Sequence, residues 1–211
     1  MGYKSSTCSV TQHALVDAFH EEHFDAMRDE GMRSGRSGAT CIACLCDDDS
    51  RECDVAYVGD SRAILFDGTA SPSGMTSVVA SDITVDLPGE RERVESREGR
   101  IVGRNVFYGP VGIAMTRALG DAVMARAGVV PTPMVGHFQL GEGDTLLLAT
   151  DGIWDVMTND AVRDIALEND RAQEAADEIA NAARQRWIGD LPVADEVKAD
   201  DITVVVVRCL A

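Results

Sequence analysis

The sequence predicts an α+β fold in which mostly antiparallel sheets are covered by helices. Short apolar runs separated by glycine and aspartate turns are typical of strands, and few helical segments lie between them. A helical period appears at the start of the chain and again in its last third. The 211 residues are 45% hydrophobic and 26% charged, with no repeat and no low-complexity linker, so we expect one globular domain over 1–211.

The first part of the chain is expected to form a helix and then a series of short strands. Apolar residues recur at three- and four-residue steps over 10–27, until glycines and serines at 31–38 break the pattern. The tight connection at 59–61 predicts a hairpin between its two flanking strands. The strands expected in this part lie at 40–46, 54–58, 62–66 and 77–80.

The rest of the chain alternates helices with strands. A charged helix is expected from Pro88 to about Glu98, because proline favours a helix start and Gly99 favours a helix end. A strand interrupted by Gly103 follows, and Thr158 is a candidate N-cap for a later helix. The closing strand is apolar enough to be central in a sheet. The expected elements are strands at 101–108, 145–150 and 202–207, a helix at 172–187 and a loop at 189–198.

Composition and charge exclude several classes of protein. Acidic residues outnumber basic ones by 36 to 19, and a net charge of −17 repels nucleic-acid backbones. No apolar run approaches the roughly 18 residues of a transmembrane helix. No apolar stretch follows Lys4 to make a secretory signal. We therefore expect a cytoplasmic or nuclear protein whose acidic surface is a solvated face.

Six cysteines are too few for a disulfide-based fold of this length, so reduced thiols are expected. Cys41, Cys44 and Cys46 form a C-x-x-C-x-C array that could indicate a soft-metal site. On a strand, however, Cys44 and Cys46 face one side and Cys41 faces the other. We interpret the three as buried core thiols rather than metal ligands.

Gly2 opens a segment, MGYKSS, that matches the N-myristoylation pattern. The pattern is short and often matches by chance, and the assigned start codon could be an artefact. We do not expect lipidation at Gly2.

Three aspartates stand at the tips of expected strands. Asp60 and Asp151 each follow a strand, and Asp200 precedes the closing one. If the three tips converged, they would form an all-oxygen site suited to Mg²⁺ or Mn²⁺. Taken singly, each is better explained as a turn former, because aspartate beside glycine is a common turn dipeptide.

The motifs around these aspartates change that balance. Residues 149–156 (ATDGIWDV) resemble the Asp-Gly-Leu-Trp-Asp signature of the type-2C protein phosphatases, the metal-dependent serine/threonine phosphatases. Six ordered blocks are far more specific than one motif, and on them the chain is identified as a member of this family. The other five blocks, in family order, are 37–40 (SGAT), 58–63 (VGDSRA), 90–102 (ERERVESREGRIV), 114–121 (AMTRALGD) and 200–205 (DDITVV).

The resemblance implies two packed antiparallel sheets with helices outside, an α-β-β-α sandwich, and a metal centre at one end between the sheets. It implies that Asp151 contacts the paired metals and that Asp200 is a second ligand, which makes both candidate catalytic residues. Asp60 matches the aspartate of a further, weaker metal site, and Arg117 matches an arginine near the site and is the candidate substrate-binding residue. The implied reaction is hydrolysis of phosphoserine or phosphothreonine in a phosphoprotein by a water that Mg²⁺ or Mn²⁺ activates, without a covalent phospho-enzyme.

The sequence departs from the family pattern at its N-terminal end. The family begins with additional chain that carries a phosphate-binding arginine and an Asp-Gly-His segment, and no Asp-Gly-His occurs here. His13, His20 and His23 lie on the expected first helix and are interpreted as surface residues, so no histidine is assigned to catalysis. We therefore expect a fold that is incomplete at the N-terminus. Three aspartates supply too few ligands for a binuclear site, so weak metal binding and weak or absent activity are expected.

Two functions follow from these observations. The first is a protein serine/threonine phosphatase, and the second is a catalytically dead phosphatase-like domain that acts as a binding or regulatory module. The missing Asp-Gly-His favours the module, whereas the retained Asp60, Asp151 and Asp200 favour the enzyme. We expect the enzyme, because a lineage without catalysis would be expected to lose these acids.

Overall fold

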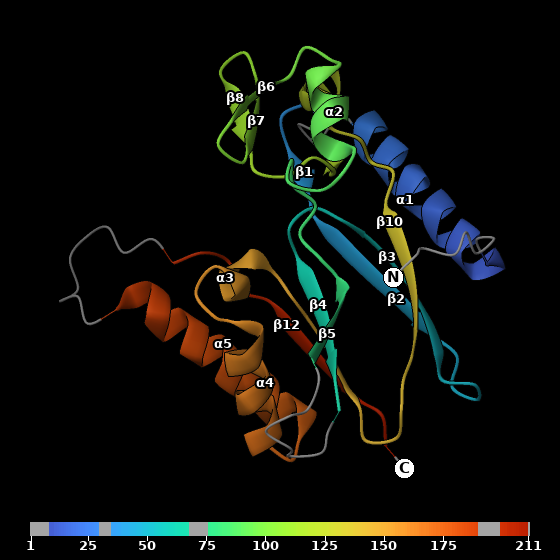
Figure 1. The fold of residues 1–211 in the computed structure, drawn as a ribbon, viewed down its shortest axis with the longest axis vertical. Coiled ribbons are helices and arrows are strands. Elements are labelled where there is room, and N and C mark those ends of the chain that lie inside the picture. Colours follow the sequence, from blue (N-terminus) through green and yellow to red (C-terminus); the bar gives the residue numbers. More distant parts are fainter. Residues whose placement is uncertain (1–8, 30–34, 68–75, 190–198, 211) are drawn as a thin grey trace. The chain divides into compact units, whose positions relative to one another are not determined.

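The computed structural model describes residues 9–29, 35–67, 76–189 and 199–210 (Figure 1). Contacts divide the chain into two compact units, each made of two chain segments. Unit 1 comprises Met1–Gly59 and Ile83–Phe138, and unit 2 comprises Asp60–Asp82 and Gln139–Ala211. No helix in the described ranges is long and apolar enough to span a membrane. Gly2 and most of the expected loop at 189–198 lie outside the described residues, and the single domain over 1–211 stays a prediction.

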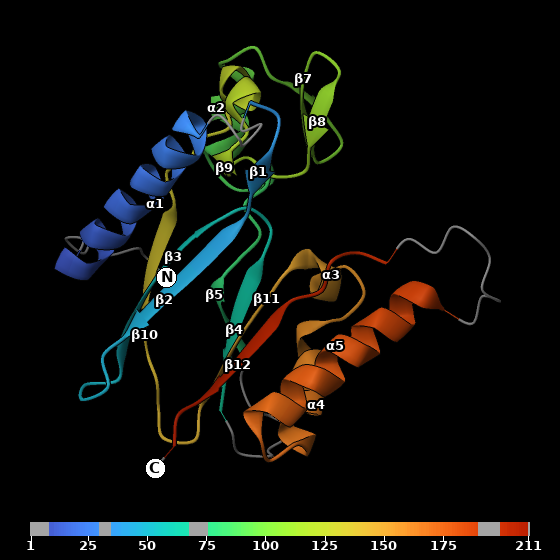
Figure 2. The same ribbon diagram turned by 180° about the vertical axis from the view of Figure 1, so that it is seen from behind.

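In unit 1, helix α1 (Val10–Arg28) packs on the three-stranded sheet β10-β3-β2 (Figure 2). Ser9 begins the helix through a capping box with Gln12, whose backbone N–H donates to the serine hydroxyl at 3.0 Å. Leu15 and Phe19 are buried on the sheet side, as four-residue spacing on one helical face predicts. The strands are β2 (Cys41–Cys46), β3 (Glu52–Val58) and β10 (Met134–Gln139).

Helix α2 (Glu90–Glu95) of unit 1 is shorter than expected. Gly89, with φ of 82°, caps its start in place of Pro88, and the Glu98 N–H donates to the Arg126 carbonyl instead of continuing the helix. The expected strand at 101–108 is a hairpin instead, because Gly103 adopts a φ of 62° and reverses the chain. The remaining elements of unit 1 are β6 (Arg100–Val102), β7 (Asn105–Tyr108), β8 (Val111–Ile113), β1 (Gly38–Ala39), β9 (Leu119–Gly120) and the 3₁₀-helix η1 (Ala122–Ala127).

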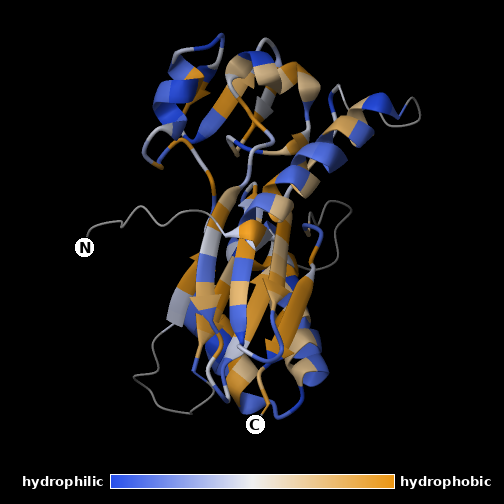
Figure 3. Ribbon diagram, turned by 90° about the vertical axis from the view of Figure 1, so that its right-hand side faces the viewer, coloured by the Kyte–Doolittle hydropathy of each residue, from blue (hydrophilic) through white to orange (hydrophobic). Residues whose placement is uncertain are grey.

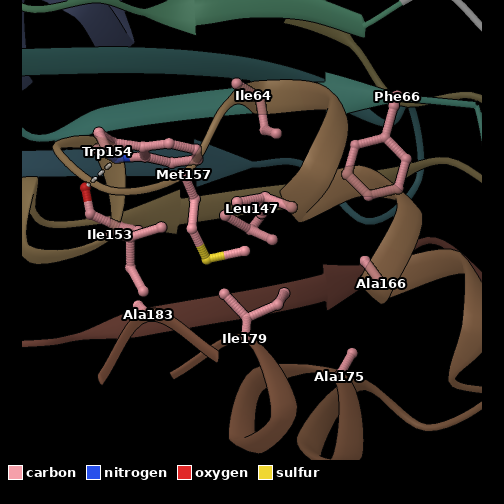
Figure 4. Packing of buried hydrophobic residues seen from close by; sticks show 12 residues of the cluster. Ile64, Phe66, Leu147, Ile153, Trp154, Met157, Ala166, Ala175, Ile179 and Ala183 are labelled. Carbon is pink, nitrogen blue, oxygen red and sulfur yellow. Dashed lines mark hydrogen bonds between the residues drawn. The ribbon is translucent and has the colours of Figure 1, made fainter. Parts of the chain in front are cut away.

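Unit 2 is a four-stranded sheet, in the order β12-β11-β4-β5, with helices α4 and α5 on one face (Figures 1 and 4). Its strands pair antiparallel, which confirms the α+β class. Ile64, Leu147 and Ile179 are fully buried where the sheet meets α5, and each contributes about 1.5–3 kcal/mol. Thr158 caps α4 as expected, accepting from the Ala161 N–H at 3.2 Å. The elements are β4 (Arg62–Phe66), β5 (Thr76–Ala80), β11 (Thr145–Ala149), α3 (Asp151–Trp154), α4 (Asn159–Glu168), α5 (Ala172–Ile188) and β12 (Val204–Arg208).

The prediction of a hairpin around 59–61 is wrong, because the two strands that flank this turn do not pair with each other. Strand β3 pairs with β2 and β10, whereas β4 pairs with β11 and β5. Gly59 adopts a φ of 94°, and its carbonyl accepts from the Ile83 N–H at 2.8 Å. The connection therefore carries the chain from one sheet to another, and the long apolar partner β11 takes the place beside β4 that a hairpin would give to β3.

The closing strand, expected at the centre of a sheet, forms the edge strand β12. Val204 and Val206 pack on the buried cluster beneath the helices, whereas Val205 and Val207 are 49% and 43% exposed. The strands carry many hydrophobic residues with hydrophilic ones interspersed (Figure 3), and β12 is an unbroken run of valines up to Arg208. A continuous apolar run therefore does not distinguish a central strand from a half-buried edge strand here.

Cys46 and Cys53 form a disulfide, which corrects the expectation of reduced thiols and of Cys46 as a core thiol. The antiparallel register of β2 and β3 places the two residues directly opposite one another, within the reach of a disulfide. Composition cannot reveal this pairing, because it depends on strand register. Cys41 and Cys44 are free and half-buried, and burial raises the pKa of the Cys44 thiol to about 11.

Candidate metal site

The strand register of unit 2 places Asp60 and Asp151 at the same end of the sheet. Arg62 of β4 pairs with Ala149 of β11. Because the strands are antiparallel, the positions two residues before Arg62 and two residues after Ala149 lie opposite each other, and these residues are Asp60 and Asp151. Each aspartate lies two residues beyond that pair, at the tip of its strand. The sheet thus accounts for the proximity of two residues that are far apart in the sequence.

Asp200 and Asp82 belong to the same end of this sheet. β12 pairs with β11 through Ala149 and Val204, and Asp200 precedes that strand. Asp82 follows β5, whose partner is β4. The end of the sheet therefore gathers one aspartate from each of its four strands.

The chain around Asp151 is held against the segment that carries Asp200. The Thr150 N–H donates to the Thr203 carbonyl at 3.1 Å, and the Thr150 hydroxyl donates to the Asp201 carbonyl at 3.2 Å. A Cβ at position 152 would lie 2.3 Å from the Asp201 carbonyl oxygen. Gly152 is therefore required for this close approach.

Two tryptophans fix the backbone on either side of Asp151. The Trp154 indole N–H donates to the Ala149 carbonyl at 2.8 Å. The Trp187 indole N–H, from α5, donates to the Gly152 carbonyl at 2.7 Å. Trp154 is buried in the cluster of Figure 4, so the loop that carries Asp151 is anchored to the core.

Like charges and burial dominate the electrostatics of this end of the sheet. Burial, together with the charges of Asp151, Asp82 and Asp155, raises the pKa of Asp60 to about 6. Burial, Asp200 and Asp155 likewise raise the pKa of Asp151. The carboxylates thus repel one another, and a bound cation would relieve that repulsion.

Sequence reasoning missed an arginine–aspartate pair beside these acids. The Arg62 guanidinium donates to both Asp82 oxygens, at 3.0 and 2.9 Å, and to the Asn159 side-chain oxygen at 2.9 Å. It also stacks over the Trp154 ring at 5.1 Å. Asp82 follows an expected strand as the other aspartates do, which was the available signal. Arg62 forms its ion pair with Asp82. Within the described part of the chain, neither Asp60 nor Asp151 has an ion-pair partner.

The donor set suits a hard cation, but it is incomplete. Carboxylate oxygens are the ligands that Mg²⁺ and Mn²⁺ prefer. Within the four described ranges, however, no group of three or more His, Cys, Asp or Glu side chains is placed to hold one metal ion. Asp60, Asp151 and Asp200 are therefore partners in one charged cluster without forming a shared coordination sphere by themselves.

Arg117 lies in unit 1, where it is held by Glu90. The guanidinium donates to Glu90 Oε1 from Nη2 at 2.7 Å and to the Thr132 carbonyl from Nη1 at 2.8 Å. Glu90 is only 1% exposed and also accepts from Arg93 and Thr116. A role of Arg117 toward substrate stays a prediction.

Comparison with known proteins identifies the family. The sequence profile of Protein phosphatase 2C matches residues 3–190. The probable protein phosphatase 2C 61 of Arabidopsis thaliana is 38% identical over 164 residues, which cover 72% of this chain and 49% of that protein. The probable protein phosphatase 2C 12 of Oryza sativa subsp. japonica is 34% identical over 184 residues, with 80% and 45% covered. The chain spans about half the length of these curated relatives.

Solved structures share the fold. The crystal structure of a serine-threonine phosphatase 2C from Toxoplasma gondii has a TM-score of 0.76 at 19% identity and covers 97% of this chain and 72% of that chain. The structure of a C. elegans sex determining protein has a TM-score of 0.75 at 20% identity, with 98% and 48% covered. On the sequence profile and the relatives above, the chain belongs to the protein phosphatase 2C family.

Proposed function

We propose that this chain contributes the aspartate ligands of a metal-dependent protein serine/threonine phosphatase. Asp60, Asp151 and Asp200 would hold Mg²⁺ or Mn²⁺, and the substrate would be a phosphoserine or phosphothreonine in a protein. The observation that supports the proposal is the strand register that brings Asp60, Asp151 and Asp200 to one end of the unit 2 sheet, where burial and neighbouring carboxylates raise the pKa of both Asp60 and Asp151. An uncompensated acidic cluster destabilises a fold unless it binds a positive partner.

Each side chain has a distinct task in this proposal. A bound divalent cation supplies Lewis-acid activation of water and of the phosphoryl oxygens. Asp151 is central, because its pKa responds to Asp200 and it in turn raises the pKa of Asp60. Gly152 lets the backbone pass beside the Asp200 segment. Arg117 would bind phosphate through guanidinium N–H groups other than those donated to Glu90 and Thr132.

The chain alone is expected to bind metal weakly and to turn over slowly. No three described acids share one ion, and the sequence contains no Asp-Gly-His segment to add a bridging ligand. That no three of the described acidic side chains are placed to bind one metal ion also favours the second candidate function, a non-catalytic binding module. The two functions make different predictions for the same experiment.

Titration with Mn²⁺, followed by the electron paramagnetic resonance signal of the free ion, tests the site directly. Binding should be weak, should decrease with competing Mg²⁺, and should be lost in Asp151→Asn. Asp170→Asn is the matched control, because Asp170 is an exposed acid of the same unit. Equal Mn²⁺ binding by Asp151→Asn and by the unmodified chain would overturn the proposed ligand role.

Hydrolysis of p-nitrophenyl phosphate and of a phosphoserine peptide separates the enzyme from the module. A fusion that adds the family's Asp-Gly-His segment should gain Mn²⁺-dependent hydrolysis, and Asp151→Asn in that fusion should abolish it. A fusion that binds Mn²⁺ but hydrolyses neither substrate would support the binding module instead. Activity that survives Asp151→Asn would come from another site.

A further inference from the structure

The disulfide between Cys46 and Cys53 is outside the proposed phosphatase site, and its two cysteines differ sharply in exposure. Cys46 ends the edge strand β2 and is exposed, whereas Cys53 of β3 is 0% exposed. Nucleophilic attack on a disulfide requires access to the attacked sulfur. Only the Cys46 side of this bond is open to a reagent from solvent.

Cys46 also lines a cavity of about 610 Å³ near the start of α1. The cavity is entirely within unit 1 and is bounded by the β2–β3 hairpin and by His137 of β10. Figure 2 shows β2, β3 and β10 beside one another near the N-terminal end of α1. The volume is large enough for a small organic molecule beside Cys46.

The lining of this cavity is acidic. Asp47, Glu52 and Asp54 contribute to it, and none of its lining residues is a lysine or an arginine. Asp54 accepts from the Ser9 hydroxyl at 2.9 Å and lies 3.1 Å from His137 Nδ1, so it is held in place. An anionic reagent is therefore disfavoured in the cavity, whereas a cationic one is attracted.

We propose that Cys46 is a thiol–disulfide exchange site for a small neutral or cationic thiol that enters this cavity. The thiol loses its proton to solvent, and its sulfur forms a bond to Cys46 Sγ as the bond between Cys46 and Cys53 breaks. The electron pair of that bond leaves on Cys53 Sγ, which takes a proton from water. The products are a mixed disulfide at Cys46 and a free thiol at Cys53.

Burial of Cys53 favours this product at equilibrium, because it stabilises the protonated thiol, and it slows the exchange in both directions, because a buried thiol is also a poor leaving group. A thiol in apolar surroundings stays protonated and is a poor nucleophile, and Cys53 is fully buried. Cys44 is the free thiol two residues from Cys46 on β2, and its own burial keeps it protonated at neutral pH. Neither thiol therefore displaces the adduct quickly.

The hairpin does not depend on the disulfide for its shape. The Asp47 N–H donates to the Glu52 carbonyl at 2.9 Å, and the Arg51 N–H donates to the Asp47 carbonyl at 2.8 Å. The Asp47 side chain also accepts from the Ser50 N–H at 2.7 Å. The adduct is therefore expected to form on a folded hairpin, and Cys46 acts as a modification site rather than as a point of unfolding.

Alkylation establishes the starting state. After denaturation without reductant, a maleimide should leave Cys46 and Cys53 unlabelled, and peptide mass spectrometry should recover them linked. Exposure of the native chain to cysteamine should then add one cysteamine to the Cys46 peptide and, after denaturation, make Cys53 available to the maleimide. Labelling of both cysteines before any thiol is added, or an adduct on Cys53, would overturn the proposal.

Three thiols of similar size test the acidic cavity. At equal thiolate concentration the adduct should form fastest with cysteamine, more slowly with 2-mercaptoethanol and slowest with 3-mercaptopropionate. The extremes should differ roughly tenfold at low salt and less than roughly threefold at about 1 M salt, where charges are screened beyond ~3 Å. Equal rates for the three thiols at low salt would refute the role of the cavity.

Matched variants locate the effect. Glu52→Gln should narrow the difference between cysteamine and 3-mercaptopropionate, whereas Glu92→Gln, on α2 of the same unit, should leave it unchanged. Cys44→Ser should retain the adduct at Cys46. An unchanged difference in Glu52→Gln, or loss of the adduct in Cys44→Ser, would contradict the assignment.

Discussion

Glu90 and Arg117 form an ion pair with 2.7 Å between Glu90 Oε1 and Arg117 Nη2, although they are 27 residues apart in the chain. Their side chains are 2% and 16% exposed. Arg93 and Thr116 donate to the same carboxylate, so one acidic side chain joins α2 to the segment that precedes β9. The sequence motifs place Glu90 and Arg117 in separate blocks, and the structure shows that they act together.

Glu90→Gln should lower the free energy of unfolding by about 3 kcal/mol. The substitution leaves two arginines without their anion in a largely buried setting, and breaking a buried pair from one side is strongly destabilising. Urea unfolding at pH 7 measures the change. Glu92→Gln is the control, because Glu92 is exposed on the same helix and its loss should change stability by less than about 0.5 kcal/mol. Similar losses in both variants would contradict the ion-pair network.

Stability should fall steeply with pH in the acid range because of Glu90. Burial alone would raise its pKa, but hydrogen bonds from Arg93, Arg117 and Thr116 lower it to about 2 from the ordinary 4.5. A depressed pKa in the folded state gives stabilisation that is complete above pH 4.5 and is lost as the pH falls toward 2. The difference in unfolding free energy between the unmodified chain and Glu90→Gln should shrink over that range. A difference that stays constant from pH 7 to pH 3 would exclude this explanation.

Asp151→Asn should stabilise the metal-free chain while removing its response to metal. The substitution deletes one member of a cluster of like charges, and relief of that repulsion is worth about 1 kcal/mol. Thermal unfolding in a chelator should show a higher midpoint than for the unmodified chain. Added Mn²⁺ should raise the midpoint of the unmodified chain and of Asp170→Asn but not that of Asp151→Asn. A lower midpoint in the chelator would argue against repulsion at this site.

Gly152→Ala should destabilise unit 2 by about 2–3 kcal/mol. The new Cβ would lie 2.3 Å from the Asp201 carbonyl oxygen, so the backbone that carries Asp151 must move away from the Asp200 segment. Gly35→Ala is the control, because nothing lies within 4 Å of a Cβ at that position. Thermal unfolding and Mn²⁺ binding should both change in the first variant and in neither for the second. Equal behaviour of the two variants would show that the close approach at Gly152 is dispensable.

Local signals in the sequence predicted the first and last helices and the cap of α4, but not the bounds of α2. The apolar spacing that buries Leu15 and Phe19 and the capping role of Thr158 depend on residues within one or two turns. The strand tips at Asp60 and Asp151 were also visible, because an apolar run followed by aspartate is a local pattern. Their alignment at one end of a sheet follows once β4 and β11 are known to pair.

Features that depend on which strands pair were not predictable in the same way. The turn at 59–61 has the composition of a hairpin, and only the pairing of β4 with β11 shows that it is not one. The bond between Cys46 and Cys53 depends on register, and the Glu90–Arg117 pair depends on how α2 meets a later segment. Each of these contacts joins parts of the chain whose local sequences carry no sign of the partner.

The order of strands in unit 2 has a consequence for synthesis on the ribosome. β4 lies between β11 and β5, and Phe66 of β4 pairs with Thr145 of β11, so 79 residues separate the two partners (145 − 66). Ile64 and Phe66 therefore leave the exit tunnel long before their pairing partner β11 has been synthesised. Chains with such distant pairings fold slowly and expose apolar surface while they wait. A nascent chain halted near Phe138 would display this uncovered strand, which makes it a natural client for chaperones.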